Sequence, residues 1–235
     1  MPPREISAPH PASETSSDAG PLPADAPASL HRHKRDAGAT QKRLLEAAER
    51  EFAQRGYAGA RLKDIASAAG VQTTLIHHYF EDKGGLYRAV LERALLPTQA
   101  ESWNLVREIR DLDGLVRGFV SMLTRFYAQH RNLLAILRHE AVTGSEVLPE
   151  ILRERLSPLA AAVIAIVADM QARGEIRREI EPRELVVLTL SMAVHPFVDG
   201  PLLQVVVPGA VPDGEAELAR RQDAIATLLL VALRP

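Results

Sequence analysis

Cysteine is absent from this chain of 235 residues, and aromatic residues make up only 4% of it. Without thiols the protein can form neither a disulfide framework nor a thiolate zinc site, and it has no thiol nucleophile. A chain without cysteine fits a reducing compartment, so we expect the protein to work in the cytoplasm.

Long apolar runs are absent as well. A membrane-spanning helix needs about 18 consecutive apolar residues, and the longest apolar candidate, residues 156–167, is closed by Asp169. The N-terminal residues also lack the apolar core of a signal peptide. We therefore expect no membrane association.

Sequence signatures of enzymatic chemistry are missing too. The chain carries no phosphate-binding loop, no Gly-x-Gly-x-x-Gly, no Gly-x-Ser-x-Gly and no His-Glu-x-x-His. The segment Arg138-His139-Glu140 comes nearest to the zinc motif, but it has no second histidine. We expect a protein that is not an enzyme and that binds no cofactor and no metal.

What the chain does contain is helical periodicity. With 46% hydrophobic and 25% charged residues, it can bury sizeable cores in one or two soluble domains. No alternating pattern of useful length predicts a strand, so we predict an all-α fold. Pro97 should end or kink one helix. Beyond it, helices are predicted at roughly 98–110, 113–129, 131–143, 149–174, 182–199 and 213–233.

Residues 1–38 differ in composition from the rest. They are rich in Pro, Ala, Ser and Asp and offer almost no aliphatic side chain to bury, which predicts a disordered tail. The tail ends in a basic cluster, His31-Arg32-His33-Lys34-Arg35. Such a cluster suits the minor groove of DNA, and it equally suits the end of a solubilising linker.

The segment from Gly56 to Lys83 predicts two short helices joined at a glycine. Apolar residues of the first helix fall at i, i+3, i+4 and i+7, at Leu62, Ile65, Ala66 and Ala69. Gly70 follows where a left-handed residue without a Cβ ends a helix. This spacing is typical of a helix-turn-helix, whose second helix enters the major groove of DNA.

The second short helix also has two faces. Its apolar face comprises Val71, Leu75, Ile76 and Phe80, and its outer face comprises Gln72, Thr73, Thr74, His77 and His78. That polar face is free to meet a ligand such as DNA. A helical hairpin with glycine at its corner also occurs in all-helical proteins that never bind nucleic acid, and the spacing alone leaves both interpretations open.

Charge differs between regions of the chain. The formal net charge is -2, yet residues 39–96 carry nine basic against seven acidic side chains. Residues 97–235 carry 15 basic against 18 acidic ones. A modestly basic region on a mildly acidic body is compatible with specific, salt-sensitive DNA binding, and it is also compatible with ordinary solvated helices.

From about Thr40 to Val90 the sequence resembles the TetR family of transcriptional regulators. The resemblance is carried by Gly56-Tyr57, Lys63-Asp64-Ile65-Ala66, Ala69-Gly70-Val71, Tyr79-Phe80 and Lys83. It departs from the family where Ala60-Arg61 replace the usual capping Thr or Ser, at an expected loss of roughly 1 kcal/mol. The resemblance implies an N-terminal three-helix helix-turn-helix domain and a C-terminal helical bundle for ligand binding and dimerisation. The implied bounds are 39–85 and 86–235.

The resemblance also implies which residues meet DNA. Four side chains should approach base edges: Lys63, Thr73, Thr74 and His77. Four others should grip phosphates: Thr40, Gln72, Tyr79 and Lys83. Asp82 should cap the helix that Lys83 begins, where a lysine ammonium opposes the favoured sign of charge and suggests a nearby anion. Gly84-Gly85 is unusual at a helix start and suggests a loosened joint between domains.

Most of the few aromatics fall in the helices predicted between residues 98 and 143. Candidates for lining an apolar effector cavity are Trp103, Phe119, Met122, Phe126 and His139. Each of them is equally compatible with a place in the hydrophobic core. Which polar group would orient a ligand is open; His139 and His195 are the candidates.

The last two predicted helices carry apolar stripes that suit a four-helix dimer interface. The candidates are Leu185, Leu188, Met192, Leu218, Ile225 and Leu229. Packing within one chain is the alternative. A dimer would place two reading helices about 34 Å apart, which suits a palindromic operator in double-stranded DNA.

Together these patterns predict a homodimeric transcriptional regulator, a repressor that a small apolar effector releases from its operator. One alternative is an all-helical small-molecule binding protein or enzyme without DNA binding. Another is a protein-interaction module that has kept the helix-turn-helix shape and lost DNA binding.

Overall fold

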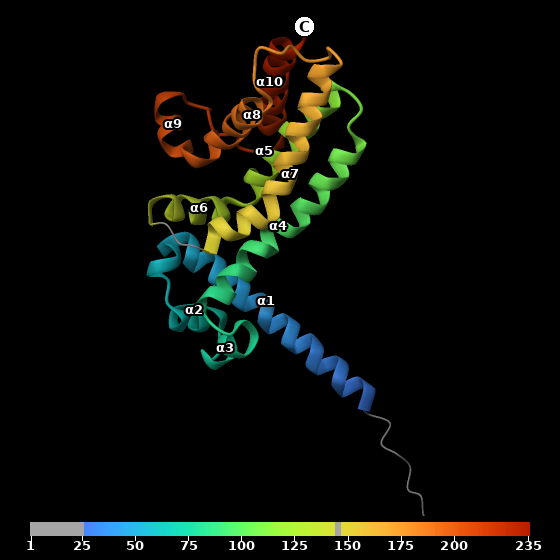
Figure 1. Ribbon diagram of the computed structural model, residues 1–235. Coiled ribbons are helices and arrows are strands. Elements are labelled where there is room, and N and C mark those ends of the chain that lie inside the picture. Colours follow the sequence, from blue (N-terminus) through green and yellow to red (C-terminus); the bar gives the residue numbers. More distant parts are fainter. Residues whose placement is uncertain (1–25, 144–146) are drawn as a thin grey trace, which may run out of the picture. The chain divides into compact units, whose positions relative to one another are not determined.

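The computed structural model describes residues 26–143 and 147–235, and these residues form helices and connecting loops without any strand (Figure 1). The predicted all-α class is confirmed. The first helices are α1 (Ala26–Gly59), α2 (Leu62–Ala69), α3 (Thr74–Phe80) and α4 (Lys83–Glu108). They are followed by α5 (Leu112–Gln129), α6 (Arg131–Thr143), α7 (Val147–Ala172), α8 (Pro182–Val198), α9 (Gly200–Val206) and α10 (Glu215–Leu233).

α1 begins at Ala26, inside the segment that composition predicted to be a disordered tail. Among the described residues, 26–38 and those from 39 onward belong to two separate units. Of the predicted disordered tail, residues 1–25 lie outside the described residues, whereas 26–38 are helical. Pro27 stands in the first turn, where a missing N–H is tolerated, and good helix formers such as Leu, Lys and Arg follow it. Average composition conceals this local propensity.

A first core, buried among α1 to α4, α6 and the start of α7, holds the helix-turn-helix in place. Its fully buried large side chains are Leu44, Phe52, Ile65, Ile76, Leu86, Tyr87, Leu91, Ile136 and Ile151. The ring of Phe52 meets Tyr87 edge to face at 4.9 Å and stacks on Tyr57 at 6.3 Å between centroids. Aromatic pairs of this kind add to the stabilisation that burial provides.

A second core lies among α5, α7, α8 and α10. It includes Val116, Phe119, Val120, Met122, Val163, Val167, Met170, Leu185, Ile225, Leu229 and Leu233. The backbone N–H of Arg177, in the turn before α8, donates to the carbonyl of Leu233 at 3.0 Å and ties that turn to the end of α10.

α4 runs from the first core to the second, beside α7 (Figure 1). Pro97 does not end this helix, which continues through that residue to Glu108. Leu95 before the proline and Ser102 after it are both buried. Arg88 pairs with Glu150 and Glu154 of α7 at 3.1 and 3.4 Å.

No single helix of the described residues is long and apolar enough to cross a membrane. α8 and α9 reach the required length only as a pair, and they are bent by 83° at their junction.

Candidate DNA-binding surface and effector cavity

The turn between α2 and α3 has the geometry that the glycine predicted. Gly70 is left-handed, with φ 68 and ψ 37. Its N–H donates to the Ser67 carbonyl at 3.1 Å, and the N–H of Val71 donates to the Ala66 carbonyl at 3.0 Å. These bonds satisfy the last carbonyls of α2 and turn the chain toward α3. At the other end of α2, Arg61 is extended and its side chain makes no capping bond.

α3 divides into an inner and an outer face. Ile76 and Phe80 are buried in the first core, with Leu75 packed against it. Gln72, Thr74, His77 and His78 are exposed, and Thr73 is half-buried. The polar side chains expected to meet DNA therefore lie on the protein surface.

His77 is oriented by the chain that follows α3. Its Nδ1 lies 2.8 Å from the carbonyl oxygen of Glu81. Because a carbonyl only accepts, the proton of a neutral His77 ring sits on Nδ1, and Nε2 is left as an acceptor. Glu81 itself adopts a positive φ of 68, which is uncommon for a residue with a side chain.

Lys83 is held at the first turn of α4. Its ammonium lies 4.8 Å from the centroid of the Tyr57 ring and donates to the carbonyl of Ala58 at 3.4 Å. Burial lowers the pKa of this lysine below its usual range. Asp82 caps α4, as predicted, by accepting from the N–H of Gly85 at 2.8 Å. Tyr79, also assigned to phosphate, is half-buried with its ring 4.9 Å from that of His78.

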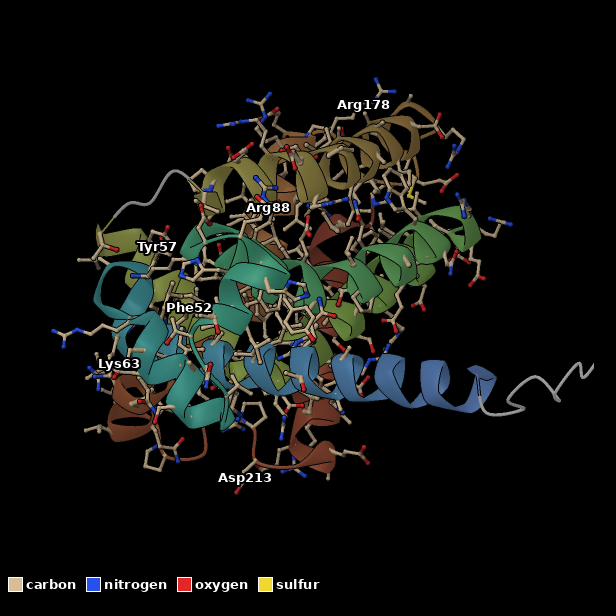
Figure 2. The ribbon with its side chains drawn as sticks, turned by 90° about the horizontal axis from the view of Figure 1, so that it is seen from below. Phe52, Tyr57, Lys63, Arg88, Arg178 and Asp213 are labelled. Atoms are coloured by element: carbon tan, nitrogen blue, oxygen red, sulfur yellow. The ribbon has the colours of Figure 1, made fainter. Side chains whose placement is uncertain are left out.

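Two further candidates come from α1 and α2. Lys63 is exposed on the outer side of α2, whereas Phe52 lies between the helices (Figure 2). Thr40 lies inside α1, and its hydroxyl accepts from the Arg43 guanidinium at 3.3 Å.

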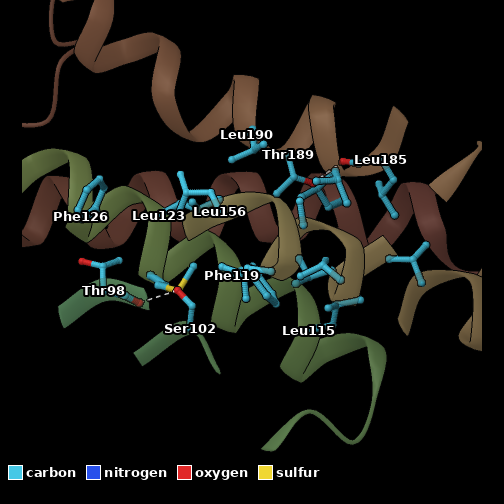
Figure 3. Close-up of a pocket in the computed structure, with 18 of the residues that line it drawn as sticks. Thr98, Ser102, Leu115, Phe119, Leu123, Phe126, Leu156, Leu185, Thr189 and Leu190 are labelled. Atoms are coloured by element: carbon cyan, nitrogen blue, oxygen red, sulfur yellow. Dashed lines mark hydrogen bonds between the residues drawn. The ribbon is translucent and has the colours of Figure 1, made fainter. Parts of the chain in front are cut away.

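A cavity of about 180 Å³ lies between α4, α5, α7, α8 and α10 (Figure 3). Three of the five predicted residues line it: Phe119, Met122 and Phe126. Trp103 and His139 do not. Trp103 of α4 is half-buried outside the lining, although its neighbour Ser102 belongs to the lining, and His139 of α6 packs against Gly56. Helical periodicity alone could not separate these positions.

The lining is almost entirely apolar, and sequence reasoning missed its polar members. These are Thr98, Gln99 and Ser102 of α4 and Thr189 of α8, whereas Tyr127 of α5, which also lines the cavity, is one of the aromatics that the sequence places in this region. Burial raises the pKa of Tyr127 above its usual range. A polar residue on an otherwise apolar helix face would have been the signal to look for.

Comparison with known proteins agrees with both halves of this geometry. Residues 44–90 match the model for bacterial regulatory proteins of the tetR family, and residues 114–228 match the tetracyclin repressor-like C-terminal domain. The transcriptional repressor SCO4008 of Streptomyces coelicolor is 34% identical over 176 residues, which cover 74% of this chain and 87% of that protein. This chain belongs to the TetR family.

Other relatives of this TetR-family chain are more distant. The transcriptional repressor BepR of Brucella suis is 28% identical, over 69% of this chain and 81% of that protein. The ketosteroid regulator KstR2 of Mycobacterium tuberculosis has a TM-score of 0.65 at 17% identity, covering 83% of this chain and 95% of its own. FadR of Bacillus subtilis, in complex with stearoyl-CoA, has a TM-score of 0.64 at 16% identity, over 81% and 98%. At such identities the two structures support the fold alone.

The expected dimer stripes of this TetR-family chain fall partly in its own interior. Leu185, Ile225 and Leu229 are buried in the second core, so that half of the assignment is wrong and the alternative, packing within one chain, applies. Met192 and Leu218 are half-buried, and Leu188 is 45% exposed. Equal spacing on a helix does not reveal which of two neighbouring apolar rows faces inward.

Four further apolar side chains are exposed on α8 and α10. They are Val187 and Leu190 of α8 and Leu228 and Val231 of α10. Leu190 and Leu228 also border a groove between these two helices, together with His195. In residues 26–143 and 147–235, no group of three or more His, Cys, Asp or Glu is placed to hold a metal ion.

Proposed function

We propose that this TetR-family regulator is a homodimeric repressor, working in the cytoplasm, that reads a palindromic operator with α3 and leaves it when a small apolar effector fills the cavity. The observation that carries the proposal is the division of α3. Its inner face is fixed by Ile76 and Phe80, and its outer face presents only polar side chains. Repression is favoured because SCO4008 and BepR are named repressors.

The base-reading set is Lys63, Thr73, Thr74 and His77. A His77 ring that donates from Nδ1 to the Glu81 carbonyl offers Nε2 as an acceptor. In the major groove, the matching donors are the amino groups of adenine and cytosine. His77 therefore favours one of these bases at its position.

The phosphate-binding set is Thr40, Gln72, Tyr79 and Lys83. The cation–π contact of the Lys83 ammonium with the Tyr57 ring, at 4.8 Å from the ring centroid, supports this role because it favours one position of the side chain. A phosphate contact adds affinity for any sequence, because the backbone is the same for every base pair.

A route from the cavity to the DNA-binding helices runs through the α5–α6 corner. Phe126 lines the cavity and packs against the first core, and its ring lies 4.6 Å from that of His130. Two residues further on, Asn132 donates to the Glu49 carboxylate of α1 at 3.2 Å. An effector that shifts Phe126 thereby biases the position of α1, and DNA must weaken effector binding by the same factor.

The test compares three substitutions in the full chain. Lys83→Met keeps an apolar stem on Tyr57 and removes the charge, so affinity should fall for every DNA sequence and the salt slope should flatten by about one unit. Thr73→Ala should instead relax preference at one base position by about 1 to 3 kcal/mol. Arg153→Met removes an exposed charge from α7 and should change neither property.

The measurement is selection of bound sequences from a random DNA pool, followed by salt titration of the selected operator. Failure of the wild-type chain to enrich any sequence would exclude operator binding. Equal effects of Lys83→Met and Thr73→Ala on all sequences would show that the two roles are assigned wrongly.

A further inference from the structure

The chemistry of the cavity lining specifies the kind of molecule that fits it. Among the lining residues, all of which belong to the described part of the chain, none carries a charge. The lining residue Gln99 donates to the backbone carbonyl of Arg155 at 2.8 Å. The guanidinium of Arg155 is itself paired with the Glu92 carboxylate at 2.7 Å. A charged ligand would therefore enter an apolar space without a counter-charge, at a large desolvation cost.

The polar members of the lining are concentrated on one wall. Thr98, Gln99 and Ser102 come from a single stretch of α4, whereas Tyr127 comes from α5 and Thr189 lies across the cavity on α8 (Figure 3). A ligand with one polar group and an apolar body matches this asymmetry, with its polar group toward α4.

Hydrogen-bond accounting shows what the α4 wall still offers. The Ser102 hydroxyl lies 2.7 Å from the Thr98 carbonyl oxygen and 2.9 Å from the Met122 sulfur, so its single proton has two protein acceptors within reach, and the Thr98 hydroxyl donates to the Ala94 carbonyl at 3.4 Å. Each hydroxyl has one proton and two lone pairs. Because both protons are used within the protein, the two hydroxyl oxygens are left as acceptors, and the amide oxygen of Gln99, whose amide nitrogen donates to the Arg155 carbonyl, is a third.

The size of the space limits the ligand. At about 180 Å³, the cavity is comparable to an engineered apolar cavity of roughly 150 Å³ that binds benzene. One substituted aromatic ring, or an aliphatic group of similar bulk, fits without rearrangement of the helices.

We propose that the effector is an uncharged hydrophobic molecule, about the size of a substituted benzene ring, that donates a hydrogen bond to the hydroxyl oxygens of Ser102 and Thr98. The role of this molecule as an effector of DNA binding rests on the proposed function. The preference of the cavity for a neutral hydrogen-bond donor does not depend on DNA, and it is measured without DNA.

The experiment is calorimetric titration of the full chain with matched probes. Para-propylphenol carries the neutral donor, para-propylanisole only an acceptor, and propylbenzene neither; para-propylbenzoate and para-propylbenzylammonium are charged at neutral pH. The phenol should bind at least about fivefold more tightly than the anisole or the hydrocarbon, the value of one neutral hydrogen bond. Both charged probes should bind at least about a hundredfold more weakly than the phenol.

Two substitutions locate the donor. Ser102→Ala should reduce the ratio of phenol to anisole affinity toward one, and Thr98→Val, which keeps the shape of the side chain, serves the same purpose if Ser102→Ala does not fold. Thr189→Val on the opposite wall is the matched control and should leave the ratio unchanged.

A charged probe that binds as tightly as the phenol, equal binding of phenol and anisole, or no binding of any probe would each overturn the inference. Operator binding by the ligand-free chain is followed separately by fluorescence anisotropy. Loss of operator binding with a retained phenol preference would refute only the proposed function, and the reverse pattern would refute only this inference.

Discussion

Gly85 shows how a single residue fixes the joint between α3 and α4. A Cβ added there would lie 2.1 Å from the backbone carbonyl oxygen of Phe80. At Gly118 and Gly200, the other described glycines with contacts below 3.0 Å, the contact is with a side chain that can move. The pair Gly84-Gly85 suggested a loose helix start, whereas at Gly85 the missing side chain permits close backbone packing.

We predict that Gly85→Ala destabilises the protein, although alanine favours helix by about 1 kcal/mol. The clash with a fixed carbonyl should outweigh that gain and lower the free energy of unfolding by about 2 to 3 kcal/mol. Gly38→Ala is the matched control: Gly38 is also helical, and an added Cβ meets nothing within 4 Å. It should raise stability by up to about 1 kcal/mol. Denaturant unfolding of both variants decides the matter; a stabilised Gly85→Ala chain would contradict the model of a tight joint.

At the residue scale, the sequence predicted the features that depend on local chemistry. The left-handed turn at Gly70 and the cap at Asp82 each need only one residue type at one place. Trp103 and His139 were misassigned to the cavity because a helical face is defined by its partners. His139 lies against Gly56, more than 80 positions earlier in the sequence, and no local pattern reveals that contact.

Among the elements, the α5–α6 corner links the cavity to α1 through charged and aromatic side chains. His130, which ends α5, has its ring against Phe126, and the Glu49 carboxylate and the Arg93 guanidinium are its charged neighbours. Arg93 also pairs with Glu49. Burial lowers the pKa of His130 below its usual value of 6.5, and of these two neighbours Glu49 raises it while Arg93 lowers it further.

This shift predicts how stability depends on pH. Below about pH 6.5 the unfolded chain takes up a proton at position 130 that the folded chain still rejects, so stability should fall as the pH falls. The slope contributed by one such group is at most about 1.4 kcal/mol per pH unit. His130→Gln should reduce the loss of unfolding free energy between pH values of about 7.5 and 5.5. The measurement at the higher pH serves as the control, because there the ring is neutral in both states.

An identical acid dependence in the wild type and the variant would contradict the burial of a neutral His130. The route through this corner is tested by titrating a cavity ligand into the operator complexes of the wild type and of His130→Gln. If the variant uncouples Phe126 from α1, the ligand should weaken DNA binding less in the variant than in the wild type.

The ends of helices could be predicted from the sequence where capping and helix-breaking residues act locally. The prediction of helix ends failed where tertiary packing decides them. α4 continues past Pro97, and Leu95 and Ser102 are buried on either side of it. α9 was missed because Gly200-Pro201 looks like a turn, although a proline is tolerated in the first turn of a helix.

For the whole molecule, the proposed mode of DNA reading requires two copies of the chain. One α3 presents a short polar face to one half-site, and a modest regional excess of two positive charges adds only limited nonspecific affinity. Joining two such heads makes the second contact intramolecular and raises the affinity by about a hundredfold or more. The exposed apolar side chains of α8 and α10 are the surface we propose for that joint.

We predict that Leu228→Arg produces a monomer. Leu228 of α10 is 57% exposed in one chain, and an arginine there would bring two like charges into a buried, symmetric contact. Leu202→Arg on α9 is the matched control, since Leu202 is 73% exposed and lies on neither α8 nor α10. Sedimentation equilibrium should find dimers of the wild type and of Leu202→Arg. The Leu228→Arg chain should sediment as a monomer, keep its helical content, and bind the operator at least about a hundredfold more weakly while still binding para-propylphenol.

A dimeric Leu228→Arg chain would show that the dimer interface lies elsewhere on the protein. A monomeric wild type with full operator affinity would exclude the reading of one operator by two copies of the chain.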